Sequence, residues 1–318
     1  MLISILLMAV GLLVLGLGAE LLVGGSSRLA LRLGISPLVI GLTIVAFGTS
    51  APELAVSILS ALGDHSELAL GNVIGSNIAN IGLILGISAI LCPLKVEIGL
   101  IKEEIPFLIA VSIALGVMLL DARIGVIDGV LLISGLIAYL AFSYWQGQKE
   151  DVQEVGDLAL QPVVPRESTS RLYVHLIMIA AGLALLVFGS DFFVDNAVEL
   201  ARLLGVSEAV IGLTLVAVGT SVPELATSAL AAVRGKTDIA VGNVIGSNLF
   251  NILSVLGITA VISPITSSPY FISDYVVMIV FTLLLLPLAK SDLTLSRREG
   301  VFLIAAYTGY FGYVGFTA

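Results

Sequence analysis

The sequence predicts an all-α polytopic membrane protein, with ten transmembrane helices arranged as two inverted-topology five-helix repeats. Three observations lead to this fold class. Hydrophobic residues make up 58% of the 318 residues, charged residues only 12%, and the mean hydropathy is +1.13. Apolar runs long enough to cross a bilayer fill nearly the whole chain. A polar motif inside one of these runs recurs in the second half of the sequence.

The recurring motif is a six-residue block of small and polar residues around a proline and a glutamate. Gly48–Glu53 reads GTSAPE, and Gly219–Glu224 reads GTSVPE. Each block is followed, after the same interval, by the identical heptapeptide GNVIGSN, at Gly71–Asn77 and at Gly242–Asn248. These residue types are unsuited to a lipid-facing helix. They are suited to an ion site where two helices are broken.

The repeat extends well beyond these motifs. Residues 41–80 align with residues 212–251 without a gap, and 24 of the 40 positions are identical. Ten apolar spans can be drawn around the two segments. They are Leu2–Gly24, Leu38–Leu62, Leu68–Leu91, Ile105–Leu120, Gly125–Tyr144, Leu172–Phe193, Ala209–Val233, Ile239–Ile262, Phe271–Ala289 and Gly300–Phe316. Five spans in each half is an odd number, so the second half enters the membrane from the opposite side, as in secondary transporters built from inverted repeats.

The domain boundaries follow from the one long polar stretch. We expect a first five-helix half over residues 1–145, a cytosolic linker over 146–171, and a second five-helix half over 172–318. The linker contains two prolines and charges of both signs, and it is too short to build a regulatory domain with its own core.

The orientation in the membrane follows from the lysines and arginines, which concentrate in cytoplasmic loops. If both termini lie outside, only Arg123 and Arg202 fall on the outer side. The inner loops and helix ends then hold the other twelve: Arg28, Arg32, Lys95, Lys102, Lys149, Arg166, Arg171, Arg234, Lys236, Lys290, Arg297 and Arg298. We therefore expect both termini outside.

Composition also excludes several functions. The net charge of -9 and the pI near 4.7 argue against nucleic acid as a partner. Cys92 is the single cysteine, which excludes an internal disulfide and a cysteine-based metal cluster. No nucleophile–base pair or phosphate-binding loop is present, so we expect neither an enzyme nor a cofactor.

Glu53 and Glu224 are the leading candidates for the functional site. Each lies well inside an apolar span, where an ionised carboxylate is expensive unless it is compensated. The middle thirds of these spans contain no lysine or arginine. Equivalent positions of two inverted halves converge near the axis that relates them, so a cation between the two carboxylates is the simplest compensation.

Pro52 and Pro223 each remove a backbone donor from the helix that carries the glutamate. We expect a kink at each, with carbonyl oxygens freed around Ala46 and Thr49, and around Ala217 and Thr220. The hydroxyls of Thr49, Ser50, Thr220 and Ser221 lie beside them in the sequence. Oxygen ligands of this kind suit Ca2+ and Na+, and not zinc or copper.

The heptapeptides and the residues after them add further polar groups. Asn80 and Asn251 each lie 27 residues beyond their glutamates, so the adjoining helix can bring the amides level with the carboxylates. Ser76, Asn77, Ser247 and Asn248 lie in the same stretches. The glycines four residues apart in each heptapeptide predict close helix packing.

Together, these residues resemble the alpha-repeats of the sodium/calcium exchanger family in the calcium/cation antiporter superfamily. The likeness rests on GTSxPE and GSNxxN in both halves and covers essentially the whole chain. It implies ten helices and a prokaryotic-type member without regulatory domains. It also implies ion ligation by Glu53, Asn80, Glu224 and Asn251, flanked by Thr49, Ser76, Thr220, Ser247 and the carbonyls of Ala46 and Ala217.

The expected function is therefore Na+/Ca2+ antiport by alternating access, electrogenic, across the inner (cytoplasmic) membrane of a prokaryote. Two carboxylates balance one Ca2+ or two Na+, and a third Na+ leaves excess positive charge. The partners are the two ions and the lipid bilayer, with a monomer as the functional unit. A proton/calcium antiporter remains open, because a glutamate can exchange a proton for Ca2+. A passive cation channel is a more distant alternative, since channels need a continuous pore.

Overall fold

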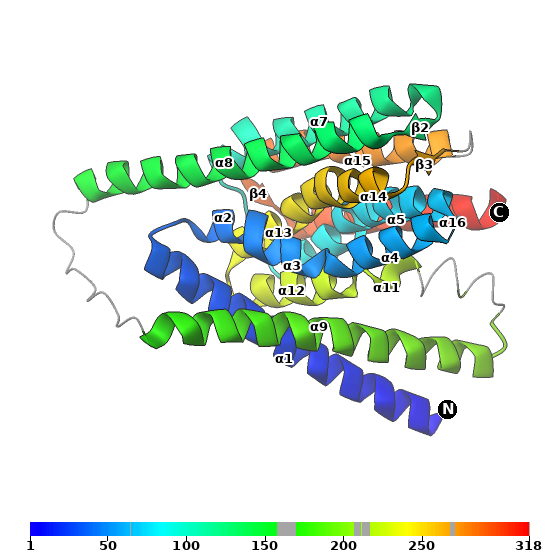
Figure 1. Ribbon diagram of the computed structural model, residues 1–318. Coiled ribbons are helices and arrows are strands. Elements are labelled where there is room, and N and C mark those ends of the chain that lie inside the picture. Colours follow the sequence, from blue (N-terminus) through cyan, green and yellow to red (C-terminus); the bar gives the residue numbers. More distant parts are fainter. Residues whose placement is uncertain (64, 158–169, 207–210, 212–216, 268–270, 318) are drawn as a thin grey trace.

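The structure is a computed structural model, and it describes residues 1–63, 65–157, 170–206, 211, 217–267 and 271–317. Nearly all of these residues are helical, which confirms the all-α fold class (Figure 1). Helices labelled η include π-helical segments, in which the backbone hydrogen bond spans one more residue than in an α-helix.

The first half contains eight α-helices, four η segments and two short strands. In chain order these are α1 (Leu2–Leu33), α2 (Pro37–Ile40), η1 (Gly41–Val45), α3 (Ala46–Thr49), α4 (Ala51–Leu62), α5 (Ser66–Ala79), η2 (Asn80–Leu85), α6 (Gly86–Leu91), β1 (Leu94–Lys95), η3 (Leu100–Glu104), α7 (Ile105–Met118), η4 (Leu119–Asp121), β2 (Arg123–Ile124) and α8 (Val126–Asp157).

The second half repeats this order. Its described elements are α9 (Ser170–Leu203), α11 (Ala217–Gly219), α12 (Val222–Val233), α13 (Thr237–Phe250), η6 (Asn251–Leu256), α14 (Gly257–Ile262), β3 (Ile265–Thr266), α15 (Phe271–Lys290), β4 (Thr294–Leu295) and α16 (Arg297–Thr317). The helices α4, α5 and α6, the π-helix η2 and both strands of the first half each have a counterpart displaced by the same 171 residues as the motifs.

Seven helical segments of the described chain are long and apolar enough to cross a membrane. An eighth span results if Pro37–Thr49 and Ala51–Leu62, which meet at a 42° bend, form one broken helix. The predicted span Ala209–Val233 lies partly outside the described residues, and α16 is not among the seven. The count of ten spans therefore stays a prediction, while the polytopic membrane fold is confirmed.

Two small sheets join the halves and reveal their inverted relation. β1 pairs with β4 and β2 pairs with β3, both antiparallel. The 171-residue offset between the halves relates β1 to β3 and β2 to β4. The internal symmetry that relates the two halves therefore maps the β1–β4 sheet onto the β2–β3 sheet. β4 and the pair β2–β3 lie toward opposite ends of the bundle (Figure 1). The predicted topology likewise assigns β1 and β4 to the inner side and β2 and β3 to the outer side.

Several helices are longer than the sequence suggested. α1 continues to Leu33, whereas we expected it to end near Gly24, and it stops at Gly34, whose φ of 66° suits glycine. α8 runs to Asp157, so the first part of the expected linker continues this helix. The rest of the linker, 158–169, lies outside the described residues.

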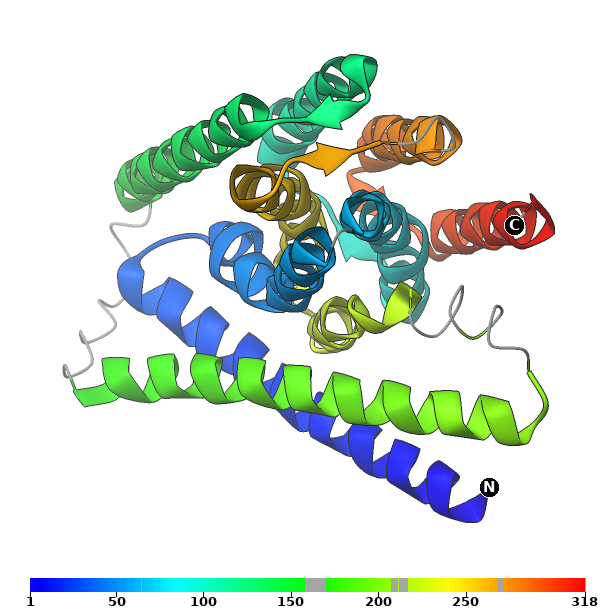
Figure 2. The same ribbon diagram turned by 45° about the vertical axis from the view of Figure 1, so that its right-hand side comes forward.

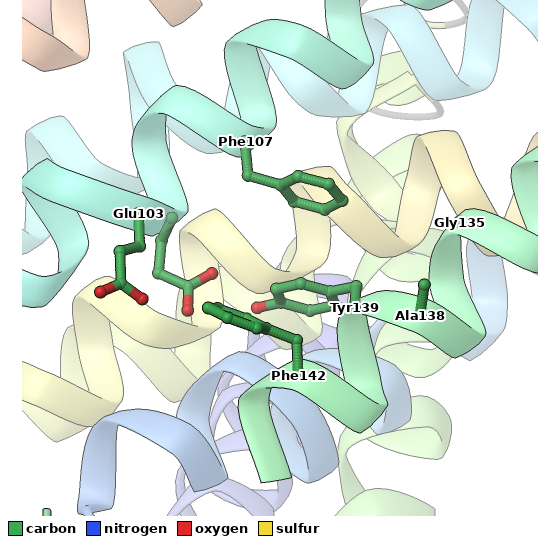
Figure 3. A pocket seen from close by; sticks show the side chains of 7 residues that line it. Glu103, Phe107, Gly135, Ala138, Tyr139 and Phe142 are labelled. Atoms are coloured by element: carbon green, nitrogen blue, oxygen red, sulfur yellow. The ribbon is translucent and has the colours of Figure 1, made fainter. Parts of the chain in front are cut away.

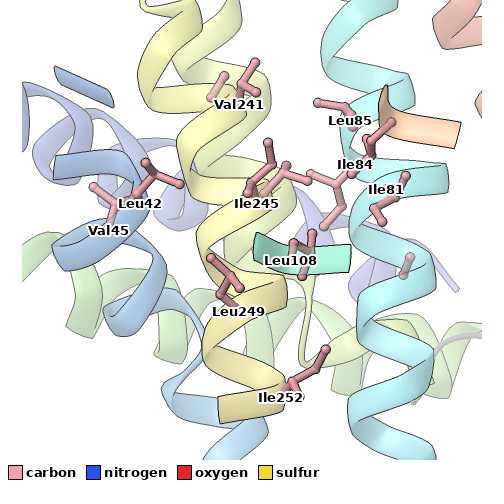
Figure 4. Packing of buried hydrophobic residues seen from close by; sticks show 14 of the residues in the cluster. Leu42, Val45, Ile81, Ile84, Leu85, Leu108, Val241, Ile245, Leu249 and Ile252 are labelled. Carbon is pink, nitrogen blue, oxygen red and sulfur yellow. The ribbon is translucent and has the colours of Figure 1, made fainter. Parts of the chain in front are cut away.

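The core is built around α13, which is buried along most of its length. Figure 4 shows Ile245 and Leu249 of α13 between Leu42 of η1 on one side and Ile81 and Ile84 of η2 on the other. A Cβ at Gly246 would lie 2.6 Å from the Leu42 carbonyl oxygen. The close packing predicted from the second heptapeptide is therefore confirmed. For the first heptapeptide, the equivalent neighbour, residue 213, lies outside the described residues.

α1 and α9 cross each other along one side of this core (Figures 1 and 2). Glycines allow them to approach closely: a Cβ at Gly18 would lie 2.9 Å from the Gly182 carbonyl oxygen, and a Cβ at Gly182 would lie 2.6 Å from the Leu22 backbone nitrogen. Close backbone approach at small residues is a common way for membrane helices to associate.

We predict that Gly18→Ala destabilises the protein by about 1–3 kcal/mol, because the added methyl group overpacks the α1–α9 crossing. Thermal unfolding of the detergent-solubilised protein measures the effect. Gly16→Ala in the same helix is the matched control, since a Cβ there meets nothing within 4 Å. Equal melting temperatures for the two variants would contradict the observed crossing.

Candidate functional site

The site begins where the two proline-containing helices break. α3 ends at Thr49 and α4 begins at Ala51, so Ser50 lies at the 42° bend with φ -81° and ψ 6°. Ser221 adopts almost the same conformation before α12, with φ -90° and ψ 6°. A proline lies at the start of each following helix because a missing N–H is harmless there.

Glu53 and Glu224 lie in the first turns of α4 and α12, and both are fully buried. Each carboxylate accepts a hydrogen bond from the other half of the chain. The Ser221 hydroxyl donates to Glu53 Oε1 at 3.1 Å, and the Ser50 hydroxyl donates to Glu224 Oε1 at 3.2 Å. The structure thus brings both acids to one place.

The amides of the second motif pair across the halves in the same reciprocal way. Asn80 Nδ2 donates to Asn248 Oδ1 at 3.1 Å, and Asn251 Nδ2 donates to Asn77 Oδ1 at 3.1 Å. Asn80 and Asn251 are each the first residue of a π-helical segment, η2 and η6. Such segments are frequent at functional sites, because they redirect side chains within a helix.

The other candidate ligands lie around these groups. Ser76 shares a 3.2 Å hydrogen bond with the Ser221 hydroxyl, and Thr220 donates to Asn72 Oδ1 at 3.4 Å. Ser247 is fully buried near the Glu224 carboxylate, and so is Thr49, whose exposure is 1%.

The backbone carbonyls differ between the halves. The Ala46 carbonyl accepts from the Ser50 N–H at 3.0 Å and from the Thr49 hydroxyl at 3.4 Å, so it is not freed as we expected. The kink falls after this bond, at Ser50. In the second half the Ser221 N–H donates to Val218 instead, and Ala217 opens the short helix α11. The two breaks are therefore not identical.

Sequence reasoning missed two asparagines that hold the broken helices in place. Asn72 Nδ2 donates to the Glu53 carbonyl at 3.1 Å and to Ser57 Oγ at 3.0 Å. In the second half, Asn243 Nδ2 donates to the Glu224 carbonyl at 3.5 Å and to Ser228 Oγ at 2.9 Å. The signal was present, since both asparagines occupy the same position of the identical heptapeptides.

The same two asparagines also connect the halves. Thr49 Oγ1 donates to Asn243 Oδ1 at 3.2 Å, and Thr220 Oγ1 makes the corresponding contact to Asn72. Each asparagine therefore supports its own glutamate and orients a threonine of the opposite motif. This arrangement positions the candidate ligands before any ion arrives.

Several buried oxygen atoms of the site have no hydrogen-bond partner among the described residues. These orphaned atoms are Glu53 Oε2, Glu224 Oε2, Asn80 Oδ1, Asn251 Oδ1 and Ser247 Oγ. Neither glutamate forms an ion pair with any lysine or arginine in the described part of the chain. A buried acceptor without a partner is costly. A cation that accepts several oxygen ligands would satisfy these atoms together.

The chemistry of the donors restricts which cation fits. Over the described ranges, no group of three or more His, Cys, Asp or Glu side chains gathers to hold a metal. The site consists instead of two carboxylates with amide and hydroxyl oxygens, which suits hard cations such as Ca2+ and Na+.

Two inverted halves, each with a broken helix and a buried acid at their junction, define a membrane transporter. Comparison with known proteins supports this assignment to the membrane transporters. The model of the sodium/calcium exchanger protein family matches residues 3–145 and 174–316, one copy in each half. The chain belongs to this family, whose members are ion transporters and not enzymes.

Individual relatives cover the full length of the chain. A putative antiporter, CaxA, of Alkalimonas amylolytica is 38% identical over 98% of both chains. The sodium/calcium exchanger MaX1 of Methanosarcina acetivorans is 34% identical over 97% of both. Among solved structures, the sodium-calcium exchanger NCX_Mj superposes with a TM-score of 0.83 at 32% identity, covering 98% of this chain and 99% of the other.

We predict that Asn243→Ala destabilises the protein by about 1–3 kcal/mol, because it leaves Ser228 and Thr49 without their buried partner. Thermal unfolding in detergent provides the measurement. Asn196→Ala is the control, since Asn196 Nδ2 donates to the Phe192 carbonyl of its own helix and does not bridge the halves. A loss no larger than the control's would mean that the asparagine bridge contributes nothing to stability.

Proposed function

We propose that this chain is a secondary antiporter that exchanges Na+ for Ca2+ by alternating access. The observation that carries the proposal is the set of orphaned oxygen atoms between the halves, on Glu53, Glu224, Asn80, Asn251 and Ser247. All five belong to the two motifs that recur in both halves of the chain, GTSxPE and GSNxxN. Their burial without a countercharge supports a binding site whose missing partner is the transported ion.

The proposed ion ligands come in matched sets from the two halves. The central group is Glu53, Glu224, Asn80 and Asn251. The flanking group consists of hydroxyls and carbonyls, namely Thr49, Ser50, Ser76, Thr220, Ser221, Ser247, and the backbone oxygens of Ala46 and Ala217. The central group holds two negative charges, which balance one Ca2+ or two Na+. No resident cofactor is part of the proposal.

Charge balance also supports electrogenic exchange. The six hydroxyl groups offer sites for monovalent ions beside the two carboxylates. Three Na+ in place of one Ca2+ would carry one net charge across the membrane in each cycle. The membrane potential then contributes about 2.3 kcal/mol per charge for every 100 mV.

The fold supports the alternating exposure of this site. The symmetry that exchanges the two halves also exchanges the two ends of the bundle. α1 and α9 lie together on one side of the core (Figure 2), and we propose that their movement opens the site to one side or the other. The monomer contains both motifs, so it is proposed as the functional unit.

Proton-coupled exchange is the second candidate, because two fully buried carboxylates could release protons when Ca2+ binds. Ca2+ uptake into proteoliposomes separates the two. A sodium gradient should drive uptake, whereas a proton gradient of equal size should not. Uptake driven only by protons would replace the sodium proposal, and uptake without any counter-ion would indicate a passive channel.

We predict that Glu53→Gln and Glu224→Gln each reduce sodium-driven Ca2+ uptake by more than about a hundredfold, since a buried charge loses its partner at a cost of about 3–5 kcal/mol. Radioactive Ca2+ uptake into proteoliposomes measures this. Glu67→Gln is the matched control, because Glu67 is exposed in the first turn of α5. Near wild-type uptake in either glutamate variant would remove that residue from the site.

We further propose that the protein resides in the cytoplasmic membrane with both termini outside, from the distribution of lysine and arginine. We predict that Gln153→Cys, near the C-terminal end of α8, reacts with a membrane-impermeant maleimide only from the cytoplasmic side. The background variant is Cys92→Ser, which removes the one native thiol. Labelling from the outside in intact cells would reverse the orientation.

A further inference from the structure

A cavity of about 470 Å³ lies between α7 and α8, and none of the candidate ion ligands lines it. Its lining residues come from the end of η3, the first turn of α7 and the middle of α8 (Figure 3). They are Glu103, Glu104, Phe107, Gly135, Ala138, Tyr139 and Phe142. A volume of this size falls in the range of small-molecule sites, roughly 300–1,000 Å³, and far exceeds the space of one metal ion.

Aromatic rings form the apolar wall of this cavity. Phe107 and Tyr139 stack with their ring centres 5.2 Å apart and their planes at 8°. Figure 3 shows Phe142 below them, on the same helix as Tyr139. Gly135 and Ala138 leave space because their side chains are absent or small. Ala138 and Phe142 are exposed, so the cavity opens at the lateral surface of the helix bundle.

Two acids, Glu103 and Glu104, lie at one end of this largely apolar cavity. Glu104 is only 7% exposed, and its Oε2 atom has no hydrogen-bond partner in the described structure. Glu103 Oε2 and the Tyr139 hydroxyl are likewise buried without a partner. The Tyr139 hydroxyl lies beside the Glu104 carboxylate and interacts with it electrostatically. Two carboxylate oxygens, Glu103 Oε2 and Glu104 Oε2, thus lie buried beside a largely apolar cavity without a hydrogen-bond partner in the described structure.

We propose that this cavity binds an amphipathic organic ammonium ion, with its nitrogen against Glu103 and Glu104 and its apolar part along the aromatic wall. A carboxylate forms strong charge-assisted hydrogen bonds to an ammonium group. The faces of Phe107 and Tyr139 attract the same positive charge. An anion would meet two carboxylates, and a bare metal ion would lack oxygen ligands on the aromatic side.

Two sources can supply this chemistry. One is the headgroup of an aminophospholipid, whose acyl chains would leave through the opening at Ala138 and Phe142. The other is a free amphipathic amine that enters by the same route. Both place an ammonium group beside Glu104, and they differ only in whether a phosphate links the amine to the apolar part.

The first test uses the full-length protein in nanodiscs and a photoreactive dodecylamine that carries a diazirine. Peptide mapping should find the label in residues 103–107 and 135–142. We expect labelling to fall about tenfold or more in Glu104→Gln, which removes the charge. A similar fall is expected in Ala138→Leu, which keeps the charge and fills the cavity.

Matched controls isolate these effects. Glu67→Gln removes an exposed carboxylate elsewhere, and Ala141→Leu enlarges an exposed alanine of α8 that does not line the cavity. Both should label like the unmodified protein. A dodecanol probe with the same diazirine should label at least about tenfold less than the amine. Equal labelling by the two probes, unaffected by Glu104→Gln, would show an acyl-chain groove and overturn the proposal.

The second test identifies the source by native mass spectrometry of protein released from nanodiscs. Retained phosphatidylethanolamine that Ala138→Leu removes, with no retained phosphatidylglycerol, supports the lipid headgroup. Dodecylamine labelling that survives an excess of phosphatidylethanolamine supports a free amine. Retention of phosphatidylglycerol in preference to both would contradict an ammonium site. None of these measurements depends on ion transport. Their outcome therefore tests the ammonium site separately from the proposed Na+/Ca2+ exchange.

Discussion

The burial of two carboxylates without a countercharge is the constraint on which the rest of this structure depends. Glu53 and Glu224 are fully buried, and each is satisfied on one oxygen only, by a serine of the opposite half. In a low-dielectric interior such an arrangement is expensive unless a cation completes it. The broken helices place these carboxylates and hydroxyls within reach of one another. The asparagines of the heptapeptides then hold the broken ends.

Reciprocity between the halves explains how a chain of short polar segments keeps a defined site. Every serine, threonine and asparagine contact described above that crosses the halves has a counterpart in which the roles of the halves are exchanged, apart from the Ser76–Ser221 bond. Neither half can satisfy its own polar groups alone. The two small sheets add backbone pairing between the halves at both ends of the bundle.

Much of the fold and of the candidate site could be predicted from the repeated motifs, because a polar block found twice within apolar sequence has few explanations besides a shared site. The roles of Asn72 and Asn243 could have been found, since Asn72, Ser76 and Asn80 are spaced by four residues and so share one helix face. The π-helical turns at Asn80 and Asn251 could not, because the hydrophobic pattern of the sequence does not mark where a helical turn gains one residue. The end of α1 at Leu33 was missed because the helix continues past the apolar run that we bounded at Gly24.

The reciprocal bonds between the halves also set an order for biosynthesis. Ser221, the hydroxyl partner of Glu53, is 168 residues farther along the chain. At a translation rate of about 5–20 residues per second, Glu53 is synthesised roughly 8–34 seconds before that serine. During this interval the first half resides at the membrane with an unsatisfied acid. Completion of the ion site is therefore a late event, which waits for the second half to be made and inserted.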